Sequence, residues 1–378
     1  MKKLYWRPAT VSVRVLSLLS LVAFAGLLSV EQLRVPERRP LYREKLAAAQ
    51  TAGRAFHLIK EERQRMGVAI DPEVDPLLSG MVGELLSPTT TNTGHLSAKQ
   101  TSVNPNFAAV VVEMLHRAGV HRNDTVAVGM SGSFPALNVA VLSACVAMQL
   151  KCLVISSAGS SQWGANHPKL SWPAMERIVA DGGVLPIRSL AVSPGGVDDR
   201  AVGLSARGKS MLDEAVASAG LTKLAPQSYD DSLDQRMQLY REHAGAEEIR
   251  AYINVGGGTT SVGTRVGKHM FAPGLNDTPP RGPAVDSVMA RFAHRGVPVI
   301  HLTRVEELAE RYGLPVAPTQ MAAPGQGQVF ARTVRSKVLA GLSLLVLFGT
   351  MIGLLRFDLG HRLVGSRVLG TGRPEPMV

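Results

Sequence analysis

The sequence predicts an α/β protein with a mainly parallel sheet, covered by helices on both faces and flanked by one transmembrane helix at each end. Short apolar runs alternate with helix-like segments between residues 107 and 302, which is the pattern of an α/β fold. These runs are continuously apolar rather than alternating with polar residues, as expected for parallel strands buried on both faces. In addition, a long apolar stretch lies near each end of the chain.

The predicted strands and helices follow one another along the chain. We expect strands at 125–130 (TVAVGM), 152–156 (CLVIS), 184–192, 251–255 (AYINV) and 297–302 (VPVIHL). Apolar residues at helical spacing predict helices at 46–66, 107–118, 135–149, 172–181, 209–219, 233–243 and 284–294. The segment 87–106 is rich in Ser, Thr, Asn and Pro and is predicted to be a loop; its length suggests a functional role.

The two terminal stretches are predicted to be membrane helices. Residues 11–30 are nearly all apolar, and residues 338–355 carry no charge; each is long enough as a helix to cross a hydrocarbon core of ~30 Å. The first stretch also resembles a signal peptide, since Lys2, Lys3 and Arg7 precede it, but no small-x-small cleavage site follows it cleanly. We therefore expect an uncleaved anchor in the inner (cytoplasmic) membrane.

Charges beside these helices indicate which side of the membrane the main domain occupies. The basic residues before the first helix and the four arginines after the second favour cytoplasmic ends and an extracytoplasmic domain. Basic residues also flank the other side of each helix, including Arg34, Arg38 and Arg335, and these oppose that orientation. We expect the extracytoplasmic arrangement.

The predicted organisation has seven parts. An N-terminal tail (1–10) and a transmembrane helix (11–30) precede a juxtamembrane helical region with the Ser/Thr-rich loop (31–106); then come the α/β domain (107–314), a Pro/Gly linker (315–337), the second transmembrane helix (338–355) and a basic C-terminal tail (356–378).

Composition excludes some function classes. The net charge is +11, but the two ends carry six of these charges, so the middle of the chain is only mildly basic. No basic run with interleaved aromatic residues occurs, which disfavours nucleic-acid binding. The two cysteines, Cys145 and Cys152, indicate neither a disulfide framework nor a zinc site, and we expect them to be buried thiols. No metal site is predicted, and no cofactor is assigned.

One candidate ligand loop follows the strand 125–130. Its small residues Ser131, Gly132 and Ser133 precede a helix, and such a turn lets backbone N–H groups approach an anion. Ser131 is also a candidate nucleophile, although the pattern G-x-S-x-G fails at Ser133. The alternative without a ligand is a tight turn in which Ser133 caps the helix.

A second loop after the next strand is also small and polar. It contains Ser157 and Gly159, and we expect it to lie beside the Ser131 loop because consecutive strands are often neighbours. Asp198 and Asp199 lie in another loop and are interpreted as a solvated pair rather than a cation site. His167, His269 and His301 are interpreted as structural histidines.

Two glycine-rich segments suggest nucleotide binding. The segment Gly256, Gly257, Gly258, Thr259 and Thr260 follows a strand and resembles the phosphate loop of actin-like ATPases, but Asn254 replaces the acid of that loop. It serves equally well as a general ligand loop. Residues 203–210 fit G-x-x-x-x-G-K-[ST]. Ser205 is, however, a good helix cap, which would place this motif inside a helix.

Three segments together resemble the poly-gamma-glutamate system protein family, PgsW. They are LSPTTTNTGHLSAKQTSVNPNFAAVVVEML, VAVGMSGSFPALNVAVL and INVGGGTTSVG, and the resemblance extends over nearly the whole chain. It implies a membrane accessory role in the synthesis or export of poly-gamma-glutamate, with the other proteins of that system as partners. It supplies no catalytic residues.

These observations predict a membrane-anchored accessory protein that binds the polymer, or a small anionic ligand, at the strand-end loops. The alternatives are a serine-dependent hydrolase or amide-transferring enzyme that uses Ser131, and a nucleotide-binding ATPase.

Overall fold

The computed structural model describes residues 13–263, 267–280 and 285–356. The chain divides into two compact units: a core unit, Arg38–Ala331, and a terminal unit formed by Met1–Glu37 and Arg332–Val378. The predicted tail 1–10 and the predicted basic tail beyond Arg356 lie outside the described residues, as does the predicted start of a helix at 284.

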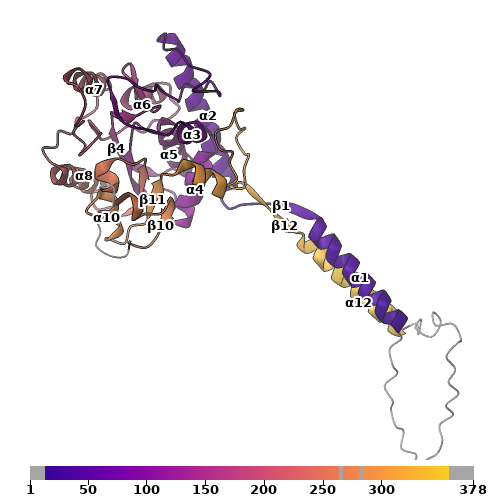
Figure 1. Ribbon diagram of the computed structural model, residues 1–378. Helices are drawn as coiled ribbons and strands as arrows, with labels where there is room; N and C mark the ends of the chain where they lie inside the picture. The colour runs from indigo at the N-terminus through magenta and orange to yellow at the C-terminus, as the bar shows by residue number, and fades with distance from the viewer. Residues whose placement is uncertain (1–12, 264–266, 281–284, 357–378) are drawn as a thin grey trace, which may run out of the picture. The chain divides into compact units, whose positions relative to one another are not determined.

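A six-stranded sheet forms the centre of the core unit (Figure 1). Its strand order is β10-β11-β9-β3-β4-β8. Five neighbouring strands are parallel, and β10 pairs antiparallel with β11 at one edge. The predicted α/β class with a mainly parallel sheet is therefore confirmed. The strands are β3 (Thr125–Met130), β4 (Lys151–Ser157), β8 (Ala191–Ser193), β9 (Ile249–Val255), β10 (Gly274–Asn276) and β11 (Val299–Leu302).

Helices cover both faces of this sheet because successive strand residues point to opposite sides. Val126 and Val128 pack into one cluster, whose helices are α2 (Tyr42–Arg65), α4 (Phe107–Arg117), α5 (Pro135–Met148) and α6 (Trp172–Asp181). Ala127 points into a second cluster, with α8 (Tyr229–Ala244) and α10 (Val288–Ala293). Beside β8, α7 (Ala206–Ser218) completes a smaller third cluster. Every residue of β3 is buried, as its apolar run predicts.

The predicted third strand is mostly wrong. Only residues 191 and 192 of the predicted segment 184–192 pair with β4, within the strand β8 (Ala191–Ser193). The N–H groups of Val184 and Leu185 both bond back to the Val179 carbonyl at the end of α6, and Pro186 has no N–H to offer a ladder. The segment therefore closes the helix and reaches the sheet only at its end.

The Ser/Thr-rich segment 87–106 is more ordered than its composition predicts. It contains the strand β2 (Thr90–Asn92) and the helix α3 (Leu96–Ser102). The strand pairs in parallel with β5 (Ser160–Ser161), which follows β4. The helix packs against α11 (Val305–Arg311), which the sequence reasoning does not include. Both elements of 87–106 are short and polar, so tertiary pairing decides them rather than local pattern.

Short elements complete the unit. They are the antiparallel pair β6 (Asn166–His167) and β7 (Leu170–Ser171), the helix α9 (Thr259–Val262) and a 3₁₀ turn at Gly267–His269.

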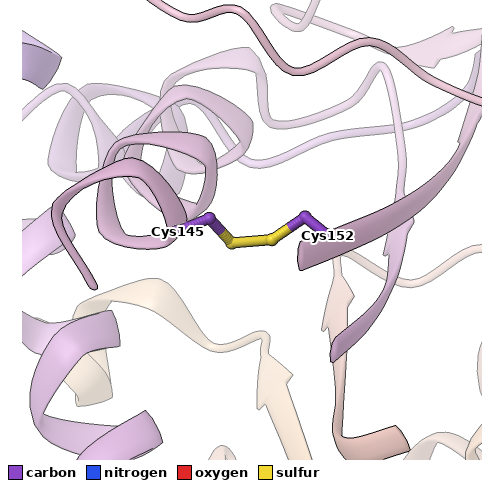
Figure 2. Close-up of a disulfide and its surroundings, with 2 residues drawn as sticks. All are labelled: Cys145 and Cys152. Atoms are coloured by element: carbon purple, nitrogen blue, oxygen red, sulfur yellow. A yellow bond between two sulfur atoms is a disulfide. The ribbon is translucent and has the colours of Figure 1, made fainter. Parts of the chain in front are cut away.

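Cys145 and Cys152 form a disulfide, so the expectation of two buried thiols is wrong (Figure 2). Cys145 lies in the last turn of α5 and Cys152 lies in β4. Between them, Gln149 adopts a left-handed conformation with φ of 56°, which reverses the chain and brings the two Cα atoms within 6.7 Å. That separation suits a disulfide.

The terminal unit holds two apolar helices, α1 (Val13–Gln32) and α12 (Lys337–Arg356), which pack side by side (Figure 1). Each contains a window of 18 residues that is long and apolar enough to span a membrane, and neither window is buried. The strands β1 (Arg34–Arg38) and β12 (Ala331–Arg335) pair with each other next to the helices. Arg332 pairs with Glu37 at 2.9 Å and Arg335 with Glu31 at 2.5 Å.

Candidate functional site

The strand order of the sheet indicates one place where a ligand would bind. After β3 the chain moves through β4 to β8 on one side, and then crosses to β9 and β11 on the other. The strand order therefore reverses between β3 and β9. Crevices outside the carboxyl ends of strands at such a switch point are the usual ligand sites of open α/β sheets.

A cleft of about 970 Å³ lies at this edge of the sheet. The two strand-end loops on either side of the switch point line it, together with the loop after β4 and the segment 91–99. Eight of the ten predicted ligand residues line the cleft: Ser131, Ser133, Ser157, Gly159, Gly257, Gly258, Thr259 and Thr260. The other two do not line it.

Those two residues, Gly132 and Gly256, instead allow the loops to approach each other. A Cβ atom on Gly132 would lie 2.9 Å from the Gly159 carbonyl oxygen. Gly256 has a φ of +85°, and a Cβ there would lie 3.2 Å from the Ser131 Cβ. Glycine is favoured at both positions because backbone packs closely against backbone or an adjacent side chain.

The hydroxyls of the Ser131 loop hold its shape. The backbone N–H of Ser133 donates to Ser131 Oγ at 3.1 Å, and the Asn138 amide donates to the Ser131 carbonyl at 2.9 Å. Ser133 Oγ accepts from the Ser161 N–H at 3.0 Å and thereby ties this loop to β5. The alternative in which Ser133 caps the helix is wrong, since α5 begins after Phe134 and no side chain caps it. In the described part of the chain, no histidine, lysine or carboxylate bonds to Ser131 Oγ.

Lys99 is a cleft residue that the sequence reasoning does not include. It lies on α3 with 3% of its surface exposed. Its Nζ donates to the Ser133 carbonyl, lies 3.0 Å from Ser161 Oγ, and stands 3.7 Å from the centre of the Phe134 ring. Burial lowers the pKa of this amine to about 7, because a low-dielectric site disfavours the charged form. No ion pair to Lys99 occurs within the ranges that the structure describes.

A buried ion pair also lines the cleft. Arg236 of α8 bonds to Asp199 through Nε at 2.8 Å and Nη2 at 2.5 Å, and both residues line the cleft. Burial, the largest single influence, disfavours the guanidinium, but Asp199, Tyr240 and Tyr252 together outweigh it and hold the pKa of Arg236 above its usual value. The interpretation of Asp199 as a solvated residue is therefore wrong. Its loop is strained, because Asp198, Asp199 and Ala201 all have φ between 51° and 61°.

The Gly256 loop rests on a buried polar pair. Asn254 Nδ2 donates to the Gly256 carbonyl at 2.7 Å and contacts His301 Nδ1 of β11 at 3.0 Å. Burial, followed by the positive charge of Arg304, lowers the pKa of His301 to about 4. His301 is thus structural, as expected, and Asn254 positions the loop rather than supplying a carboxylate.

The second nucleotide-like segment lies within a helix. Ser205 caps α7, and its Oγ accepts from the Gly208 N–H at 3.1 Å. Gly208 and Lys209 are therefore helical residues, as Ser205 predicts, and no residue of this motif lines the cleft. Among the described residues, no group of three or more His, Cys, Asp or Glu side chains could hold a metal ion.

No protein-family model, curated protein or solved structure matches this chain. The chemistry of the cleft is therefore inferred from its own residues.

Proposed function

We propose that this protein is a membrane-anchored, extracytoplasmic accessory protein of poly-gamma-glutamate synthesis or export, and that its cleft binds the polymer. The observation that carries the proposal is the hydroxyl-lined cleft at the switch point. It supports a chain-binding role because its size is at the upper end of ordinary ligand pockets.

The lining of the cleft suits a γ-linked glutamate chain. Each repeat of that chain offers an amide N–H, an amide carbonyl and a free carboxylate. Hydroxyls can donate to and accept from all three groups, and ten of them line the cleft: Thr91, Thr93, Ser131, Ser133, Ser157, Ser161, Thr259, Thr260, Ser261 and Thr303. Glycines in four of its loops, including Gly159 and Gly257, leave backbone groups open to the chain.

The charges of the cleft favour recognition of the repeat over attraction of any polyanion. Lys99 and Arg304 are balanced by Glu306 and Glu307, and Arg236 is already paired. Attraction that depends on charge alone is screened by salt. We therefore expect hydrogen bonds to the amide and carboxylate, rather than net charge, to supply the selectivity.

The two membrane helices and the disulfide support the extracytoplasmic location. If both helices span the membrane, the chain between them occupies one side. Disulfides persist in oxidising compartments and are rare in the cytosol, and Cys145–Cys152 is one. A reporter fused near residue 320 tests this location: activity of an export-dependent reporter is expected, whereas activity of a cytosol-dependent reporter would contradict it.

A binding assay tests the proposed ligand. The full-length protein in nanodiscs is titrated into a fluorescein-labelled γ-linked hexaglutamate, and fluorescence anisotropy is measured. We expect saturable binding that an α-linked hexaglutamate of equal charge displaces poorly. The variant Ser131→Ala/Ser133→Ala should weaken binding by roughly 10- to 30-fold, since each lost hydrogen bond costs about 1 kcal/mol.

A matched control is Ser210→Ala, an exposed serine of α7 outside the cleft, which should bind as the wild type does. Absence of saturable binding, or equal competition by the α-linked peptide, would contradict the proposal.

A further inference from the structure

We propose that the cleft is also catalytic: Ser161 is a nucleophile and Lys99 its general base, acting on an amide bond of the bound chain. The choice of a γ-glutamyl amide as substrate rests on the proposed function. The serine–lysine pair itself does not depend on the proposed function.

A neutral amine can make the contacts of Lys99, as an ammonium can. Such an amine has two N–H donors and one lone pair. One N–H reaches the Ser133 carbonyl, and Nζ lies over the Phe134 ring. Lys99 Nζ donates to Ser161 Oγ at 3.0 Å, while the Ser161 hydroxyl donates to the Gln162 carbonyl at 3.5 Å. When the amine is neutral and the hydroxyl rotates, the Nζ lone pair can accept the Ser161 proton over the same distance. Both residues line the cleft, so the pair faces the space that a substrate would occupy.

The surrounding secondary structure holds the pair in place. Ser161 ends β5, which pairs with β2, and β2 leads within a few residues into α3, where Lys99 lies. The Gln162 N–H donates to the Asn92 carbonyl at 3.0 Å, and the Gly94 N–H donates to Gln162 Oε1 at 3.1 Å. These bonds between the two segments fix the distance between base and nucleophile, as a pre-organised site requires.

Electrostatics support the same assignment. Burial lowers the pKa of Lys99 to about 7, so a large fraction of the amine is unprotonated near neutral pH, where a general base works best. The other titratable and charged groups of the cleft are His95 beside α3, Arg304, Glu306 and Glu307 on or next to α11, His269, and the pair Asp199–Arg236. None of them forms a hydrogen bond or ion pair with Lys99 in the part of the chain that the structure describes. Glu306, for example, accepts from Ser97 Oγ at 2.6 Å.

The reaction is a two-step acyl transfer. Ser161 Oγ attacks the amide carbonyl carbon while its proton moves to Lys99 Nζ. The C–N bond then breaks, the protonated lysine returns the proton to the leaving amine, and an ester to Ser161 remains. In the second step, Lys99 takes a proton from water or from an amine as that nucleophile attacks the ester carbon. The ester C–O bond then breaks, and the protonated Lys99 returns the proton to the departing Ser161 Oγ. Water gives a shorter chain with a new carboxylic acid, and an amine gives a transferred amide.

Covalent labelling tests the nucleophile. The full-length protein in nanodiscs is incubated with a fluorophosphonate, from which an activated serine displaces fluoride, and the labelled peptide is identified by mass spectrometry. We expect a single adduct on Ser161. The labelling rate should rise as the pH rises through about 7, because the base must be unprotonated.

Two variants test the roles of the pair. Ser161→Ala should remove the adduct, and Lys99→Arg should slow labelling by at least ~100-fold, since a guanidinium does not act as a base at these pH values. Ser210→Ala and Lys209→Arg, both exposed on α7, are the matched controls and should label as the wild type does. If either cleft variant fails to fold, the adduct position and pH profile of the wild type still decide the question.

An adduct on Ser131 or Ser133, no adduct in folded protein, or a labelling rate independent of pH between 5.5 and 8.5 would overturn the catalytic assignment. Binding of the γ-linked oligomer without an adduct leaves the proposed function intact and removes only the catalysis. An adduct on Ser161 without oligomer binding supports the serine–lysine pair with a different substrate and contradicts the proposed function.

Discussion

Removing the carboxylate of Asp199 should strongly destabilise the core unit. Asp199 accepts hydrogen bonds from Arg236 Nε and Nη2, from Ser193 Oγ at 2.5 Å and from Ser232 Oγ at 2.8 Å. The side chains of Arg236 and Asp199 are only 4% and 7% exposed. Asp199→Ala therefore leaves a buried, unpaired guanidinium, and breaking such a pair costs about 3–5 kcal/mol.

This cost corresponds to a measurable fall in melting temperature. The core unit has about 290 residues, so its unfolding entropy is roughly 0.6 kcal/mol/K, and a loss of ~4 kcal/mol lowers Tm by about 5–8 °C. Differential scanning calorimetry of the full-length protein in detergent measures this shift. The matched control is Asp213→Asn, whose partner Lys223 lies 2.6 Å away with both side chains 40–50% exposed. This exposed pair should contribute less than ~1 kcal/mol.

A double variant separates the cost of the unpaired charge from the loss of packing. Asp199→Ala/Arg236→Met leaves no charge at the site, so it should melt above Asp199→Ala alone. The reasoning is refuted if Asp199→Ala melts within about 1 °C of the wild type, or if the double variant melts lower than the single one.

Three further predictions concern other features of the core unit. Replacing Cys145 and Cys152 by serine should lower the free energy of unfolding by ~2.5 kcal/mol, the value expected for the short loop that the disulfide closes. Chemical denaturation measures this difference, and no change would mean that the bond is absent or strained. Gly164→Ala should weaken hexaglutamate binding, because the new Cβ would lie 2.7 Å from the Ser133 carbonyl oxygen and 2.8 Å from its Cα. The control Gly53→Ala, whose new Cβ meets open space, should bind normally. Equal binding by the two variants would show that Ser133 is not part of the site. As the pH falls from 6.5 to 4, the wild type should lose up to ~3 kcal/mol more stability than His301→Asn. The reason is that His301 takes up a proton at a higher pH in the unfolded chain than in the folded chain. Urea denaturation measures both stabilities, and parallel pH profiles of the two proteins would disprove this.

Elements that are defined by a local pattern of apolar residues could be predicted from the sequence. The strand at 125–130 and the helix at 172–181 have the predicted bounds, because a continuous apolar run marks a buried parallel strand and helical spacing of apolar residues marks an amphipathic helix. The strand-end loops at Ser131 and Gly257 could be assigned to one cleft for a related reason: parallel strands bring their carboxyl ends to the same edge.

The rest of the site depends on contacts between distant segments, which a local sequence pattern does not predict. Lys99 meets Ser161 only because β2 pairs with β5, two strands of three and two residues. Asp199 meets Arg236 across 37 positions of sequence, and its loop uses left-handed residues that are not glycine. The disulfide depends on one such residue, Gln149, whose conformation the sequence does not reveal.

The position of the polymer on the protein is the most direct test of the central claim. A γ-linked hexaglutamate carrying a diazirine is cross-linked by light to the full-length protein in nanodiscs, and the modified residues are identified by mass spectrometry. We predict cross-links within 91–99, 131–134, 157–161 and 257–261, four of the segments that line the cleft, and their loss in the presence of excess unlabelled oligomer. Cross-links that fall only on other surfaces, such as the apolar hollow around Gln64 and Ile70, would contradict the account.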